Sequence, residues 1–217
     1  MNLIDAFAWI ADASHWGGAN GIGRRTIEHL GITFLAVLIA AVIAVPAGIL
    51  IGHTRKGAGA IGAFTGAFRA LPTLGLLTLF GLVLGIGLGA PLLALVILAI
   101  PSLLAGAYSG IQSIDPTIPG AAKAIGMSPA QVITKVEIPL AVPVMVGGLR
   151  AAVLQVIATA TLAAYTADVG LGRYLFAGMK TRDYPQMVAS ALLVTALAII
   201  LEIVLGLVQR RVRNAHV

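Results

Sequence analysis

The stretch Gly120-Ala-Ala-Lys-Ala-Ile-Gly-Met-Ser-Pro-Ala-Gln-Val-Ile-Thr-Lys-Val-Glu-Ile-Pro139 separates two long apolar segments and has the residue order of two short helices that meet at a bend. Pro119 suits the first turn of a helix, and the Ala-rich run after it favours helix propagation. Gly126 stands where the end of a helix requires positive φ. The four residues from Ser128 form the pattern of a capping box with proline at its first helical position. We therefore predict a helix, a glycine bend and a second helix limited by the final proline.

The bend of this stretch leaves an apolar elbow on the surface. Ile125 and Met127 flank Gly126 and face water unless another protein covers them. From the residues alone two interpretations stand side by side. The stretch is either an ordinary cytoplasmic loop or a docking site for a partner.

The composition is that of an integral membrane protein. Apolar residues make up 59% of the 217 residues and charged residues 10%, with a mean hydropathy of +1.01. A soluble domain carries roughly 25% charged residues. The chain has no cysteine, which excludes disulfides and cysteine-based metal or redox chemistry. The net charge of +6 lies mostly at the edges of apolar segments, so membrane topology explains it better than a nucleic-acid partner.

The apolar segments predict an all-α fold with about five transmembrane helices. A helix needs roughly 20 residues to span a bilayer, and the expected spans are residues 30–51, 72–88, 91–111, 140–165 and 187–208. Residues 3–16 have a helical apolar period that suits a helix in the membrane interface. We divide the chain into an N-terminal interfacial segment (1–25), a transmembrane domain (26–211) with a loop at 115–139, and a cytoplasmic tail (212–217).

The basic residues predict the orientation. With the N-terminus outside, the inner side holds eight Lys and Arg residues and the outer side five. Positive charge is enriched on the cytoplasmic side of membrane proteins, so residues 120–139 are expected in the cytoplasm.

Four polar residues within the apolar spans are candidates for a solute pathway or gate: Arg150, Gln155, Thr159 and Glu202. Arg150 follows Pro139 by eleven residues, about 16 Å along a helix, which is near the middle of a ~30 Å hydrocarbon core. A charge at that depth has to face protein or water. Arg150 therefore either braces its helix against a neighbour or takes part in gating. Glu202 is a plausible ionic partner for Arg150 or Arg69.

Several motifs carry a resemblance to a known family. The spacing of Ala121-Ala122, Gly126 and Val136-x-Ile138-Pro139 resembles the "EAA" signature of ATP-binding-cassette (ABC) importer permeases, although Gly120 replaces the leading Glu of that signature. Residues 68–80 resemble the corresponding stretch of the osmoprotectant permeases for glycine betaine, carnitine and choline. The Gly-Leu-Gly at 170–172 is similar to a turn that follows the fourth span in the family.

The resemblance implies that this chain is the permease subunit of an ATP-driven importer and forms the pathway for a quaternary-ammonium osmoprotectant (glycine betaine, carnitine, choline or proline betaine) or, as the alternative, for another betaine-like or amino-acid-type solute. It implies that a cytoplasmic ABC ATPase docks on the loop and that this ATPase binds ATP-Mg. This chain itself has no phosphate-binding loop and no histidines at metal-ligand spacing, and we do not expect it to be an enzyme. The resemblance also implies a second permease subunit, identical or homologous, an extracytoplasmic substrate-binding protein, and a multi-pass location in a bacterial or archaeal inner membrane. The implied ATPase-coupling residues are Ala121, Ala122, Ile125, Gly126, Met127, Ser128, Glu137 and Pro139.

Two other classes of protein remain open on the sequence. An ion-coupled secondary transporter predicts internal repeats and acidic ligands near the middle of the membrane. A membrane scaffold that anchors a cytoplasmic partner explains the apolar elbow but gives Arg150 and Gln155 no role in transport.

Overall fold

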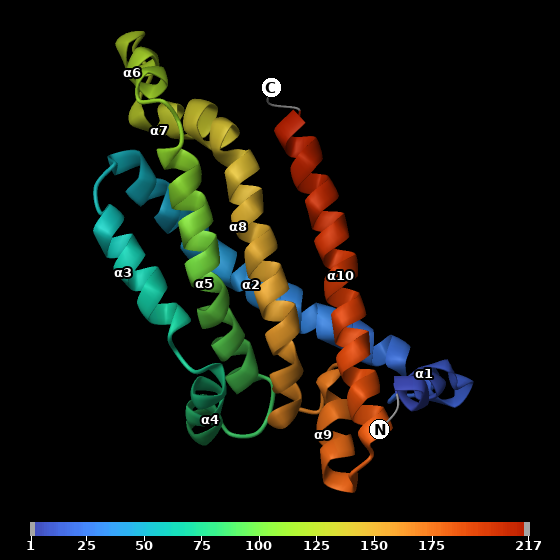
Figure 1. Cartoon of the computed structure of the whole chain (residues 1–217). Coiled ribbons are helices and arrows are strands. Elements are labelled where there is room, and N and C mark those ends of the chain that lie inside the picture. Colours follow the sequence, from blue (N-terminus) through green and yellow to red (C-terminus); the bar gives the residue numbers. More distant parts are fainter. Residues whose placement is uncertain (1–2, 215–217) are drawn as a thin grey trace. The chain divides into compact units, whose positions relative to one another are not determined.

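The computed structural model describes residues 3–214, with the side chains of Ala58, Ala60 and Arg69 outside the description. The predicted pairing of Glu202 with Arg69 therefore lies outside the described residues. Within the described range every regular element is helical, which confirms the all-α fold (Figure 1).

Within residues 3–214, four helices are long and apolar enough to cross a membrane, in agreement with four of the predicted spans. They are α2 (Ile22–Thr54), α5 (Gly89–Gln112), α8 (Ile138–Thr159) and α10 (Tyr184–Asn214). Two shorter helices, α3 (Ala58–Arg69) and α4 (Thr73–Leu84), follow each other across a break and give a fifth span if the pair counts as one. Pro72 at this break lacks a backbone N–H and disfavours a helical residue before it.

The long helices extend past the apolar spans predicted from hydropathy. α2 begins at Ile22, eight residues before the expected start, because its polar first turns are satisfied by ion pairs such as that between Arg25 and Glu28. α10 likewise continues through the basic tail to Asn214. Hydropathy marks the part of a helix that lies in lipid, whereas the backbone hydrogen bonds continue into the polar boundary.

The chain forms two compact units, and each long helix contributes residues to both. The first unit consists of residues 3–37, 72–96 and 153–202. Its core packs Ile22 of α2 against Leu171, Tyr174 and Val194, with Trp9 of α1 (Leu3–Ala11) at the edge. A short 3₁₀ turn, η1 (Ala13–His15), follows α1, and the 3₁₀ segment η3 (Ala160–Tyr165) connects α8 with the region of α9 (Gly172–Thr181).

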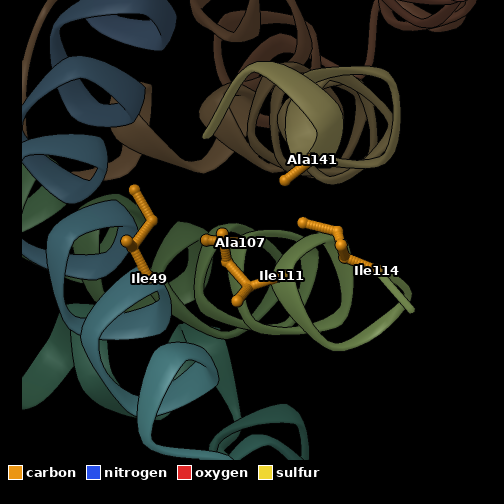
Figure 2. Close-up of a cluster of buried hydrophobic side chains, with 5 residues drawn as sticks. All are labelled: Ile49, Ala107, Ile111, Ile114 and Ala141. Carbon is orange, nitrogen blue, oxygen red and sulfur yellow. The ribbon is translucent and has the colours of Figure 1, made fainter. Parts of the chain in front are cut away.

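The second unit consists of residues 38–71, 97–152 and 203–214. Figure 2 shows its core, in which Ile49 of α2 and Ala141 of α8 pack against side chains of α5 and the turn after it, namely Ala107, Ile111 and Ile114. α5 and α8 approach closely at Gly106 and Gly148, where a Cβ on Gly148 would lie 2.7 Å from the Cα of Gly106. Small residues allow such contact between membrane helices, and van der Waals packing then holds them together.

Candidate functional site

The segment between α5 and α8 contains the predicted bend, and we call residues 115–139 the coupling segment. Its first helix, α6 (Thr117–Ala124), ends in a Schellman motif: the N–H of Met127 donates to the carbonyl of Ala122 and that of Gly126 to the carbonyl of Lys123. Gly126 has a φ of +91°, which confirms the predicted positive φ. A side chain is strained in this backbone conformation whatever space surrounds it.

The second helix of the coupling segment, α7 (Pro129–Val132), begins with the predicted capping box. The Ser128 hydroxyl accepts from the N–H of Gln131, and the Gln131 side chain accepts from the N–H of Ser128. Pro129 occupies the first helical position, as predicted. Both helix ends at the bend are therefore satisfied within the segment itself, so the bend has a defined shape.

The elbow between these helices presents apolar surface to the outside. The side chain of Ile125 is 82% exposed, and Met127 is half-buried beside it. On α6, Ala121 is exposed whereas Ala122 is buried against the rest of the segment. A large exposed apolar side chain on a rigid bend is the arrangement expected of a protein contact.

The end of the coupling segment differs from the prediction. The second helix was expected to be limited by Pro139, but α7 continues through a π-helical stretch, η2 (Ile133–Glu137), directly into α8, where Pro139 is the second residue. Pro139 has no N–H to donate to the preceding turn. Just before it, the chain widens into a π-helical turn in which the N–H of Ile138 donates to the carbonyl of Ile133, and the segment continues into the membrane helix without a break.

The end of α2 holds the coupling segment on both sides. His53 Nδ1 lies 2.7 Å from Oε2 of Glu137, whose residue is only 2% exposed. Ahead of α6, Arg55 donates to the carbonyl of Ile114 at 2.8 Å. Gln112 at the end of α5 donates to the carbonyl of Gly52 at 3.0 Å. The carboxylate of Glu137, which the family resemblance assigned to coupling, thus makes its contact inside this chain.

The intramembrane polar residues are distributed over both units. In the second unit, Arg150 donates to Oε1 of Gln209 at 2.9 Å, a contact between α8 and α10 that favours the bracing interpretation. In the first unit, Thr159 donates to the carbonyl of Gln155 at 2.8 Å and lines a cavity, while Glu202 is half-buried. The pairing of Glu202 with Arg150 stays a prediction.

A buried arginine that the sequence reasoning did not single out organises the polar start of α2. The side chain of Arg25 is 4% exposed and donates to Asn20, Glu28 and Asp168, the last through both its backbone carbonyl and its carboxylate. Glu28 in turn accepts from the N–H of Gly170 in the Gly-Leu-Gly turn. No local pattern marks this cluster, because Asp168 lies 143 residues from Arg25.

The fold is that of ABC importer permeases. A solved structure described as inward-facing conformations of the MetNI methionine ABC transporter matches with a TM-score of 0.74 at 24% identity, covering 85% of this chain and 93% of that one. A crystal structure of an amino acid ABC transporter with histidines matches with a TM-score of 0.70 at 20% identity, covering 97% and 99%. At these identities the likeness shows the fold alone.

Residues 44–214 match the family described as "Binding-protein-dependent transport system inner membrane component", and the chain belongs to that family. The choline transport system permease protein OpuBB of Bacillus subtilis is 34% identical over 88% of each chain. The glycine betaine/carnitine/choline permease protein OpuCB of the same species is 36% identical over 87% of each. The osmoprotectant import permease protein OsmW of Salmonella typhimurium is 33% identical over 85% of this chain and 88% of the relative.

Proposed function

We propose that this chain is the permease subunit of an ATP-driven importer and that its solute is a small quaternary-ammonium osmoprotectant. The observation that carries the choice of solute is the match, over nearly the whole length, to permeases named for choline, glycine betaine and carnitine. The location that follows is the inner membrane of a bacterial or archaeal cell.

The coupling segment supports the assignment of a cytoplasmic ATPase as partner. Ile125 and Met127 form an apolar elbow, and the Schellman motif and capping box fix its shape. A segment of defined shape passes a displacement on to the helices that it joins. ATP binding by the partner then shifts α5 and α8 between two arrangements, as expected for a two-state transporter.

Two further partners complete the proposal. The four or five spans found in the described part of the chain are few to enclose a solute pathway, so a second permease subunit, either a copy of this chain or a homologue, forms the other half. The family description names a binding protein, which on this proposal delivers the solute from outside.

The test compares two glycine variants of the coupling segment. The complex is purified from its host with the partners that accompany it and reconstituted in liposomes, and glycine betaine uptake and stimulated ATP hydrolysis are measured. Gly126→Val introduces a β-branched residue at φ +91°, which costs on the order of 1–3 kcal/mol locally and distorts the elbow. The matched control is Gly120→Ala, a glycine within α6 that has no atom near its Cβ position and ordinary helical geometry.

The native complex and Gly120→Ala are expected to couple ATP hydrolysis to uptake, whereas Gly126→Val loses stimulated hydrolysis while the membrane helices remain folded. If no ATPase accompanies the native chain, and neither glycine betaine, carnitine nor choline is taken up, the proposed function is wrong.

A further inference from the structure

A cavity of about 600 Å³ lies within the first unit, among α4, the end of α8 with η3, α9 and α10. Its volume is in the range of small-molecule sites. Half of the described residues that line it carry a hydroxyl group. These residues are Thr73, Thr159, Thr161, Ser190 and Thr195.

Two of the hydroxyls already donate their protons in hydrogen bonds within the chain. Thr159 Oγ1 donates to the carbonyl of Gln155 and Ser190 Oγ donates to the carbonyl of Leu171, each at 2.8 Å. A hydroxyl has one proton and two lone pairs. The side-chain oxygens of Thr159 and Ser190 therefore present only lone pairs to a ligand. Such lone pairs suit the positive end of the ligand.

The protons of the other three hydroxyls are available for hydrogen bonds to a ligand. In the part of the chain that the structure describes, the side chains of Thr73, Thr161 and Thr195 make no hydrogen bond. Each can donate, and a carboxylate accepts several such bonds. The cavity thus holds hydroxyl donors and hydroxyl acceptors together.

The cavity carries no formal charge. Among the described residues that line it, the remainder are small or apolar: Ala158, Leu162, Leu175, Ala191 and Val194. A ligand with a net charge would lose its hydration here without meeting an opposite charge, which is costly. A zwitterion brings no net charge, and a trimethylammonium group has no N–H to satisfy, so its methyl groups can contact the apolar lining.

The walls of the cavity are held in place by close contacts. A Cβ on Gly172 at the start of α9 would lie only 2.0 Å from the carbonyl oxygen of Thr161, so α9 rests directly on η3. The bond from Ser190 to Leu171 ties α10 to the same region. These contacts fix the positions of Thr161 and Ser190 before a ligand arrives, which favours selective binding.

We propose that this cavity is a solute-binding site of the permease and that it selects a zwitterionic methylated-ammonium carboxylate over a net cation of similar size. The proposal rests on the proposed function. It adds the location of a solute site and the way this site selects: the uncharged hydroxyl lining discriminates between solutes by their net charge.

The test measures solute binding to the purified permease–ATPase complex in nanodiscs, without binding protein, so that the selectivity of that protein plays no part. Equilibrium dialysis with radiolabelled glycine betaine and choline gives the two dissociation constants. The variants Thr161→Val and Thr195→Val each remove one donor at nearly constant volume, and Thr195→Ser restores it. The control is Thr78→Val on α4, a threonine that does not line the cavity and whose hydroxyl donates to the carbonyl of Leu74.

The native complex is expected to bind glycine betaine more tightly than choline. Each donor variant weakens glycine betaine binding by about tenfold, the effect of losing one hydrogen bond to a charged group, and leaves choline binding within about twofold. Thr195→Ser and Thr78→Val behave as the native chain does. Thermal unfolding of the permease reports whether the variants are folded.

Three results overturn the inference. Unchanged binding in both donor variants removes the cavity as the site, and an equal loss of both solutes removes the selectivity by net charge. Tighter binding of choline than of glycine betaine by the native complex also contradicts it. In each case ATP-driven uptake of glycine betaine by the native complex leaves the proposed function standing, whereas the absence of any uptake refutes both.

Discussion

His53 Nδ1 lies 2.7 Å from Oε2 of Glu137, so the last turn of α2 holds the carboxylate that stands where the coupling segment enters α8. Glu137 is 2% exposed, and a buried carboxylate is costly unless a partner satisfies it. The pair therefore fixes the second arm of the coupling segment to a helix outside it. A displacement of the elbow has to move the end of α2 as well.

Removal of the imidazole should weaken both folding and coupling. His53→Ala leaves the Glu137 carboxylate buried without this partner, and we expect a loss of about 1–3 kcal/mol in the free energy of unfolding. Because the coupling segment is then held less firmly, more ATP should be hydrolysed per solute taken up. Thermal unfolding in detergent and the ratio of hydrolysis to uptake measure the two effects.

A double-mutant cycle separates the pair from its surroundings. Adding Glu137→Ala to His53→Ala should cost less than Glu137→Ala costs in the native chain, because residues in contact are not additive. Thr54→Ala, next to His53 but exposed, serves as the control. Strict additivity of the two substitutions would show that the contact contributes nothing.

The buried guanidinium at the start of α2 should resist even a conservative change. Arg25 uses two nitrogens to reach Asn20, Glu28 and Asp168, and the compact ammonium of a lysine cannot match that planar fork. We expect Arg25→Lys to lower the free energy of unfolding by about 2 kcal/mol, through the loss of hydrogen bonds to charged groups.

The neighbouring arginine provides the comparison. The Arg24 side chain is 63% exposed and pairs only with Glu28 among the described residues, so Arg24→Lys should change stability by less than about 0.5 kcal/mol. Equal effects of the two substitutions in thermal unfolding would contradict the role assigned to Arg25.

The elbow could be predicted from local sequence signals, whereas the contacts between distant residues could not. The positive φ of Gly126 and the capping box of Ser128 and Gln131 depend on residues within a few positions of each other, and both were confirmed. The contact of His53 with Glu137 spans 84 positions, and nothing next to either residue indicates it. The hydroxyl-lined cavity was not predicted for the same reason. Thr159 was singled out, but Ser190 and Thr195 look like ordinary polar residues in an apolar span.

Two glycine-to-alanine changes, one at the contact between α5 and α8 and one in α2, should have opposite effects. Gly148→Ala places a methyl group 2.7 Å from the Cα of Gly106, where backbone has to move, and should destabilise by about 1–3 kcal/mol. The new methyl group of Gly31→Ala in α2 meets no atom within 4 Å among the described residues, apart from its own stretch of helix, and should stabilise that helix by up to about 1 kcal/mol. Thermal unfolding of the two variants tests this difference in sign. A neutral Gly148→Ala would show that the two helices separate easily.

The first turn of α6 should loosen at acidic pH. The Asp115 carboxylate accepts from the backbone N–H and the hydroxyl of Thr117, and these bonds hold the pKa of Asp115 below its ordinary value of 3.8. The stabilisation is complete above the unfolded pKa and is lost as the pH falls through the lower folded pKa. Amide exchange in α6, corrected for its intrinsic rate, should therefore show less protection at low pH.

Substitution by asparagine gives the control for this titration. Asp115→Asn keeps an oxygen acceptor at the same position but removes the acidic group. Its amide exchange in α6 should not change over the same pH range beyond the intrinsic effect. If the native chain and Asp115→Asn lose protection in parallel, Asp115 is not the group responsible.

The division of every long helix between the two units has a consequence for how the protein is made. α10 gives residues 184–202 to the first unit and 203–214 to the second, so both remain incomplete until α10 has been synthesised. Neither unit corresponds to an uninterrupted piece of chain. A truncation before α10 therefore removes residues from both units.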